Sequence, residues 1–106
     1  MAVSLTRWNA SDYLETPEDM LAYLDEAART GEPALLQAAL GDVARARGMS
    51  EVARSAGVGR ESLYKSLSAD GNPSFQTVAR VVAALGGQIS VTPRSDVASA
   101  RGHLGP

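Results

Sequence analysis

The sequence has no cysteine and a single histidine, His103. Without cysteine, neither a disulfide framework nor a thiolate metal site can form, and His103 lies in a glycine-containing tail where nothing can orient it. The paired acids Glu18-Asp19 and Asp25-Glu26 diverge on a helix, because adjacent residues do not share a face. No phosphate-binding loop, nucleophile elbow or metal-ligand spacing is found either. The sequence therefore predicts a protein that is not an enzyme and binds no cofactor or metal.

Long apolar runs and aromatic side chains are also scarce. No run approaches the roughly 18 apolar residues that a transmembrane helix needs, and residues 1–8 lack the basic and apolar regions of a secretory signal. We therefore expect a cytoplasmic protein that does not interact with membranes. One tryptophan, three tyrosines and one phenylalanine among 44% hydrophobic residues favour closely packed helices over a strand-rich sandwich. At 106 residues, the chain has room for one hydrophobic core.

Basic side chains are few in the first part of the chain, and acidic ones are few in the rest. Residues 1–42 contain eight acidic and two basic side chains, a net charge of −6, whereas residues 43–106 contain eight basic and four acidic ones, a net charge of +4. This asymmetry suggests two partners, a polyanion for the basic part and a basic surface for the acidic part. The alternative is an ordinary solvated surface.

Five helices are predicted from apolar spacing and from capping residues. They cover about residues 17–30, 33–47, 51–56, 60–67 and 75–85. Thr16, Ser50 and Ser74 are the expected hydroxyl N-caps, with proline following Thr16 at the first helical position. Residues 88–92 alternate like a short strand, and residues 94–106 have the composition of a disordered tail.

A helix-turn-helix pattern occupies residues 49–67. Ala53 is small where two helices must cross closely, and Gly57 can adopt the left-handed conformation of the turn. The pattern resembles the helix-turn-helix of phage repressors, except that Ser66 stands where an apolar residue is expected and Leu67 follows it. We predict a mainly α protein: a compact five-helix, phage-repressor-like domain with a short C-terminal strand. Its predicted divisions are an N-terminal extension with the first helix, the DNA-binding domain and a tail, at residues 1–32, 33–92 and 93–106.

Recognition of double-stranded operator DNA follows from where these side chains should point. The second helix of such a motif enters the major groove, where arginine or lysine can bind guanine and glutamate can accept from cytosine. The expected base contacts are Arg60, Glu61, Tyr64 and Lys65, and the expected phosphate contacts are Ser50, Arg54, Ser68 and Asn72. In the alternative, the charged residues form only a solvated face with a Glu61–Lys65 pair.

The wider sequence resembles the HigA-like addiction-module antidotes, which are helix-turn-helix antitoxins. The resemblance covers about residues 5–92. It is carried by Trp8, Asp12-Tyr13-Leu14, residues 18–24, 31–35 and 39–50, and Asn72-Pro73-Ser74-Phe75. It implies that the protein binds and silences a small basic toxin resembling the RelE and HigB ribonucleases, and that it represses its own operon as a homodimer.

The acidic first third offers a physical basis for toxin binding, because it would attract a basic ribonuclease that its apolar residues could then anchor. The candidate toxin contacts are Trp8, Tyr13, Leu14, Glu18, Asp19, Tyr23 and Asp25. The aromatic members of this set could instead pack the first helix onto the domain.

Other functions and interfaces stay open at this point. The chain could be a stand-alone transcriptional regulator, or an interaction adaptor that has kept the helix-turn-helix shape without binding DNA, since +4 is a modest basic excess. A dimer could form through the face beside Val78, Val81 and Val82, or by pairing of residues 89–91 across a two-fold axis. The same strand could also pair within one subunit.

Overall fold

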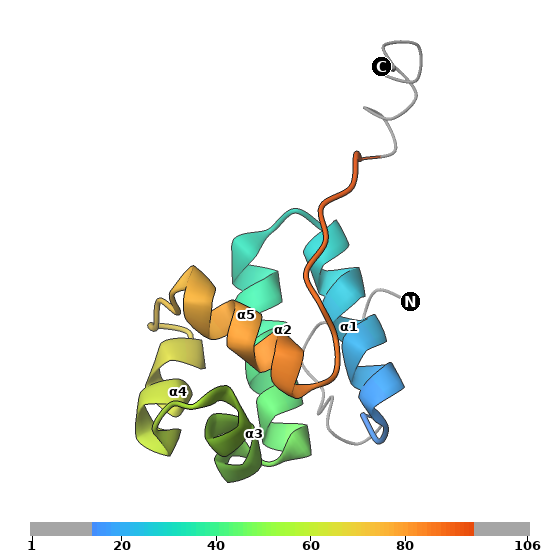
Figure 1. The fold of residues 1–106 in the computed structure, drawn as a ribbon. Helices are drawn as coiled ribbons and strands as arrows, with labels where there is room; N and C mark the ends of the chain where they lie inside the picture. The colour runs from blue at the N-terminus through green and yellow to red at the C-terminus, as the bar shows by residue number, and fades with distance from the viewer. Residues whose placement is uncertain (1–13, 95–106) are drawn as a thin grey trace.

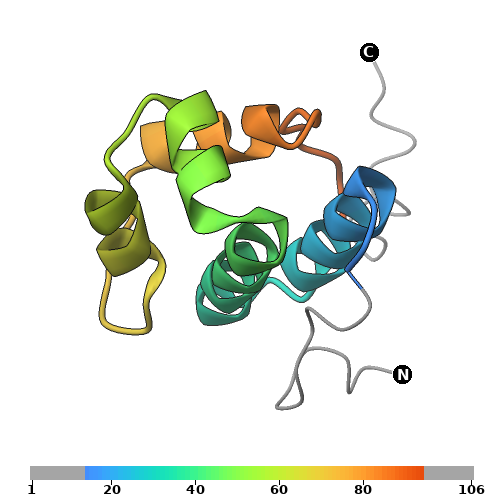
Figure 2. The same ribbon diagram turned by 90° about the horizontal axis from the view of Figure 1, so that it is seen from below.

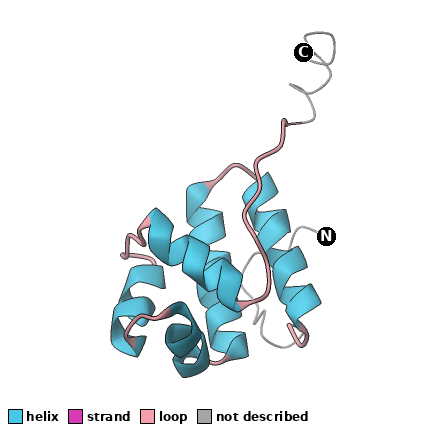
Figure 3. Cartoon of the chain, in the orientation of Figure 1, coloured by secondary structure: helices cyan, strands magenta, loops and turns pink. Residues whose placement is uncertain are grey.

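The computed structural model describes residues 14–94, and this part of the chain folds into five α-helices (Figures 1 and 3). The helices are α1 (Pro17–Arg29), α2 (Pro33–Arg47), α3 (Met49–Ala56), α4 (Arg60–Leu67) and α5 (Phe75–Ala84). The predicted mainly α fold with five helices is confirmed. None of the described helices is long and apolar enough to cross a membrane.

The helix starts follow the capping residues in two of three cases. At α1, the Thr16 hydroxyl accepts from the Asp19 amide at 3.1 Å, and the Asp19 carboxylate accepts from the Thr16 amide at 3.2 Å. At α5, the Ser74 hydroxyl accepts from the Thr77 amide at 3.0 Å. Such a cap stabilises a helix by about 1 kcal/mol.

The start of α3 differs from the prediction. α3 begins at Met49 after Gly48, whose φ of 111° turns the chain sharply out of α2. Ser50 therefore lies inside the first turn of α3 and is not its N-cap. The Ser50 hydroxyl did not mark the start of α3, because Gly48, with its positive φ, already turns the chain between α2 and α3.

The core is formed where α2 meets its neighbours. α2 packs against α1, α3 and α4, and α5 packs chiefly on α3. The largest side chains that are almost fully buried come from α2, α3, α4 and α5: Leu40, Val43, Val52, Leu63 and Val81. The small residues Ala53 and Ala56 are also buried, which lets α3 lie close to its neighbours.

The predicted C-terminal strand is absent from the part of the chain that the structure describes. Residues 85–94 leave α5 and continue past α1 without forming a strand (Figure 1). A strand needs a neighbouring strand to satisfy its backbone groups, and no other described segment is extended beside this one. The strand is thus not confirmed within residues 14–94, because the alternation of Ile89 and Val91 specifies an extended segment but not a partner. The predicted tail lies, from residue 95 onward, outside the described residues, as do residues 1–13.

Candidate functional site

α3 and α4 form a bihelical unit, residues 49–67, joined by a short turn. Gly57 ends α3 in the left-handed conformation with a φ of 73°. Its amide donates to the Arg54 carbonyl at 3.2 Å, and the Val58 amide donates to the Ala53 carbonyl at 3.0 Å. These bonds close the last turn of α3 and direct the chain into α4, as the sequence predicted for Gly57.

The orientation of α4 about its axis is set by two leucines. Leu63 and Leu67 lie one turn apart and are 1% and 4% exposed. Ser66 is half-buried and donates to the Leu63 carbonyl at 3.1 Å. Leu67 therefore takes the core position that the motif usually gives to the preceding residue. Four exposed residues of α4 carry the predicted base contacts and are named here the α4 face: Arg60, Glu61, Tyr64 and Lys65.

The charged side chains of the α4 face form no ion pair within the described part of the chain. None of the ion pairs found among residues 14–94 includes Arg60, Glu61 or Lys65. The alternative Glu61–Lys65 pair is therefore not formed. Arg54, by contrast, binds Glu51 at 2.9 Å. Such an exposed pair contributes at most about 1 kcal/mol, so a phosphate could readily compete for Arg54.

The predicted phosphate contacts lie on both sides of α4 and differ in availability. Ser50 on α3 and Asn72 after α4 are exposed. Ser68 is half-buried, and its hydroxyl donates to the Lys65 carbonyl at 2.7 Å. Since that bond uses its only proton, Ser68 can accept a hydrogen bond but cannot donate one to a phosphate without breaking it.

One residue that the sequence analysis missed holds the loop after α4. The Gln37 side chain on α2 donates to the Ser68 carbonyl at 2.6 Å and to the Gly71 carbonyl at 3.0 Å. A Cβ on Gly71 would collide with the Lys65 carbonyl, so glycine lets this loop fold back on α4. An isolated glutamine carries no sequence signal for such a role. Gln37 thereby fixes the position of Asn72 relative to the α4 face.

The acidic candidates on α1 form a second exposed surface. Glu18, Asp19 and Asp25 are all exposed. Asp19 also completes the N-terminal cap of α1, and Asp25 accepts from Arg29 at 2.8 Å. That hydrogen bond, with the Coulomb attraction of the same carboxylate, raises the pKa of Arg29 above its ordinary value. Glu18 has no ion pair within residues 14–94, so its charge is available to a partner.

Two other candidates for toxin binding lie in the core, which corrects the predicted surface. Leu14 and Tyr23 are 3% and 4% exposed. The Tyr23 hydroxyl donates to the Asp42 carboxylate at 2.7 Å and so ties α1 to α2. Neither side chain can touch a partner docked on this conformation. Trp8 and Tyr13 lie outside the described residues.

The two surfaces lie at opposite ends of the helical body. Figures 1 and 2 show α1 and α4 separated by α2, and α1 makes its main contacts with α2. The fold and these surfaces define a class: a small helical protein that carries an acidic helix at one end and an exposed cationic and aromatic helix at the other.

The comparisons with known proteins give the family. The family model described as "Probable addiction module antidote protein" matches residues 4–93, and the chain belongs to this family. It is also 44% identical over 91 residues to an uncharacterized protein of Haemophilus influenzae. The aligned region covers 86% of this chain and 94% of that protein. No solved structure matches. An antidote implies a toxin partner, which fits the two-surface arrangement.

Proposed function

We propose that the chain is the antitoxin of a type II toxin–antitoxin module, of the HigA-like kind. In this proposal it silences a RelE/HigB-like ribonuclease by direct binding and represses its own operon through a helix-turn-helix formed by α3 and α4. It acts in the cytoplasm by binding alone and not as an enzyme. The observation that carries the proposal is the α4 face, a set of exposed side chains that form no ion pair with residues 14–94, in a member of an antidote family.

Operator recognition would use the α4 face in the major groove. Arg60 and Lys65 present donors suited to the O6 and N7 atoms of guanine, and Glu61 can accept from the N4 amino group of cytosine. Ser50 and Asn72, exposed on the flanking segments, would bind phosphates, and Arg54 would exchange Glu51 for a phosphate. These flanking contacts set the register of α4 in the groove.

A homodimer would place two such helices on one operator. Two-fold related copies bind half-sites separated by about one DNA turn, roughly 34 Å. The exposed Val91, with its alternating neighbour Ile89, supports a pairing of residues 88–92 across the two-fold axis, because no strand partner for that segment is found among residues 14–94. In this arrangement the strand predicted from sequence would form only in the dimer.

Toxin binding would use the acidic side of α1. Glu18 and Asp25 are exposed there, in a segment of net charge −6. A basic ribonuclease surface would be attracted to this charge and would associate faster at low ionic strength. Because α1 and α4 are separate, a bound toxin would leave the α4 face accessible to DNA.

Co-expression tests the proposal. The tagged chain would be produced together with the product of its neighbouring small reading frame. We expect that product to elute with it at fixed stoichiometry, and growth arrest by that product to be relieved. Absence of both complex and arrest would refute the antitoxin role. A salt-dependent shift of the upstream DNA would then identify a stand-alone regulator, and its absence would leave an interaction adaptor.

A further inference from the structure

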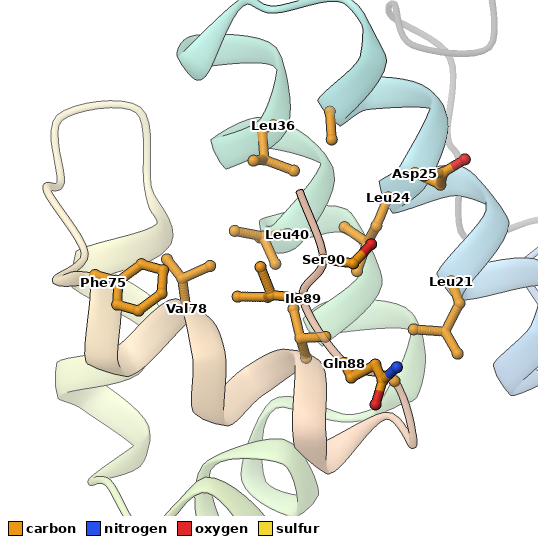
Figure 4. Close-up of a pocket in the computed structure, with 13 residues that line it drawn as sticks. Leu21, Leu24, Asp25, Leu36, Leu40, Phe75, Val78, Gln88, Ile89 and Ser90 are labelled. Carbon is orange, nitrogen blue, oxygen red and sulfur yellow. The ribbon is translucent and has the colours of Figure 1, made fainter. Parts of the chain in front are cut away.

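An apolar groove opens between α1, α2, α5 and the segment that follows α5 (Figure 4). Its volume is about 590 Å³. Nine of its thirteen lining residues are apolar side chains: Leu21, Leu24, Ala28, Leu36, Leu40, Phe75, Val78, Val82 and Ile89. Figure 4 shows Leu21 and Phe75 toward opposite ends of the groove, with Ile89 between them. The segment after α5 forms one wall of the groove and lies close to α1 at Gly87, where a Cβ would be 2.7 Å from the Leu21 Cδ2 atom.

The groove exists because α5 is apolar on two sides but is covered on only one. Val81 and Leu85 are buried, and α5 packs chiefly on α3. Val78 and Val82 are only half-buried, and Phe75 is 74% exposed. Apolar side chains gathered in an open groove are a feature of surfaces that bind a partner.

Acidic side chains run along one rim of this groove. Glu18, Leu21 and Asp25 follow one another at spacings of three and four residues, so they share one side of α1. Leu21 and Asp25 line the groove, and Glu18 lies one turn nearer the start of the helix. An occupant therefore meets apolar side chains on the floor and carboxylates on the rim.

We propose that this groove receives an apolar segment of the toxin whose flanking lysines or arginines lie over α1. The inference rests on the proposed antitoxin function and specifies where the toxin docks. A second copy of this chain fits less well, because a two-fold contact centred on the groove would bring two acidic α1 helices together. No residue of α4 lines the groove, so the occupied antitoxin keeps the α4 face free.

The test uses the full chain and the purified product of the neighbouring small reading frame. The Leu21→Gln, Phe75→Ser double variant removes apolar groups from both ends of the groove without touching residues 88–92, and Gln76→Ser is its matched control. Gln76 is exposed on α5 beside Phe75 and does not line the groove. Since Phe75 is 74% exposed and Leu21 is only half-buried, both variants should fold, which circular dichroism and thermal melting would verify.

Titration calorimetry would measure toxin affinity, and sedimentation equilibrium would measure self-association. We expect the double variant to lose roughly 10- to 100-fold in toxin affinity, the control to match wild type, and both to keep the wild-type oligomeric state. Unchanged toxin affinity in the double variant would overturn the inference. A double variant that turns monomeric with wild-type toxin affinity would instead identify the groove as a self-association surface. Failure of the wild-type chain to bind the toxin would refute the proposed function itself, and this inference with it.

Discussion

The α4 end and the α1 end of the molecule differ in how well the exposure of their candidate residues could be predicted from the sequence. At the α4 end, all four residues predicted to face outward are exposed: Arg60, Glu61, Tyr64 and Lys65. At the α1 end, the acids Glu18, Asp19 and Asp25 are exposed, but Leu14 and Tyr23 are buried. The predicted exposure therefore holds for all four candidates at the α4 end and for three of the five described candidates at the α1 end.

The difference lies in the kind of pattern that supported each prediction. At α4 the expected surface came from helical spacing, which places Glu61, Tyr64 and Lys65 away from the buried Leu63 and Leu67. Arg60, at the first position of the helix, is exposed although it lies three residues before Leu63. At α1 it came from charge and from a list of large apolar residues. Charge is a reliable guide to exposure, because a lone carboxylate is costly to bury. An aromatic residue is not, since tyrosine can pack in a core when its hydroxyl has a partner, as Tyr23 does with Asp42.

The largest effect should come from removing the anchor of the α4 face. Leu63→Ala deletes a side chain that is 1% exposed, and we expect the free energy of unfolding to fall by about 2–5 kcal/mol. Tyr64→Ala, on the neighbouring exposed position, should change stability by at most about 0.5 kcal/mol. Urea denaturation followed by circular dichroism measures both. Equal losses would show that the assigned orientation of α4 is wrong.

A smaller effect is expected from changing the α4 face itself. Arg60→Ala should lower operator affinity by about 1–3 kcal/mol and relax specificity at one base pair, with toxin affinity unchanged because α1 and α4 are separate. Fluorescence anisotropy with operator and scrambled DNA measures both quantities at fixed salt. Glu32→Ala, an exposed acid far along the chain from α4, is the control. A parallel loss of toxin affinity would show that the two surfaces are coupled.

Tyr23→Phe tests the corrected role of Tyr23 at the α1 end. The variant keeps the ring and removes the hydrogen bond to Asp42, so we expect stability to fall by about 0.5–1.5 kcal/mol. Toxin affinity should stay at the wild-type value once the variant is folded. Thermal melting and calorimetry measure the two effects separately. A loss of toxin affinity without a loss of stability would show that Tyr23 belongs to the toxin-binding surface after all.

Much of the fold was predictable because its signals are local. Pro17 and Pro33 mark the starts of α1 and α2, Ser74 caps α5, and Gly57 has the left-handed conformation that the turn needs. These residues act on their own backbone or on that of near neighbours. The expected strand is not confirmed for the opposite reason, because its formation depends on a partner segment that is not found among the described residues.

The candidate site was predictable to the extent that it lies on one helix. Spacing on α4 is enough to place its exposed face. The link from Gln37 to the loop at Ser68 and Gly71 joins residues more than thirty positions apart, and no local pattern encodes it. The apolar groove combines three helices and the segment after α5, so it became visible only once the tertiary arrangement was known.

The smallest expected effect concerns Arg54. Its substitution tests whether this residue positions the protein on the DNA backbone or recognises a base. Its pair with Glu51 is exposed on both sides, so Arg54→Gln should leave stability within about 0.5 kcal/mol of wild type. If Arg54 binds a phosphate, the variant should bind operator and unrelated DNA more weakly by a similar factor, and the slope of log affinity against log salt should become shallower by about 1. Anisotropy titrations at several salt concentrations give that slope, with Arg29→Gln on α1 as the matched control. A loss confined to the operator sequence would contradict this role, since it would place Arg54 on a base and extend the recognition surface from α4 onto α3.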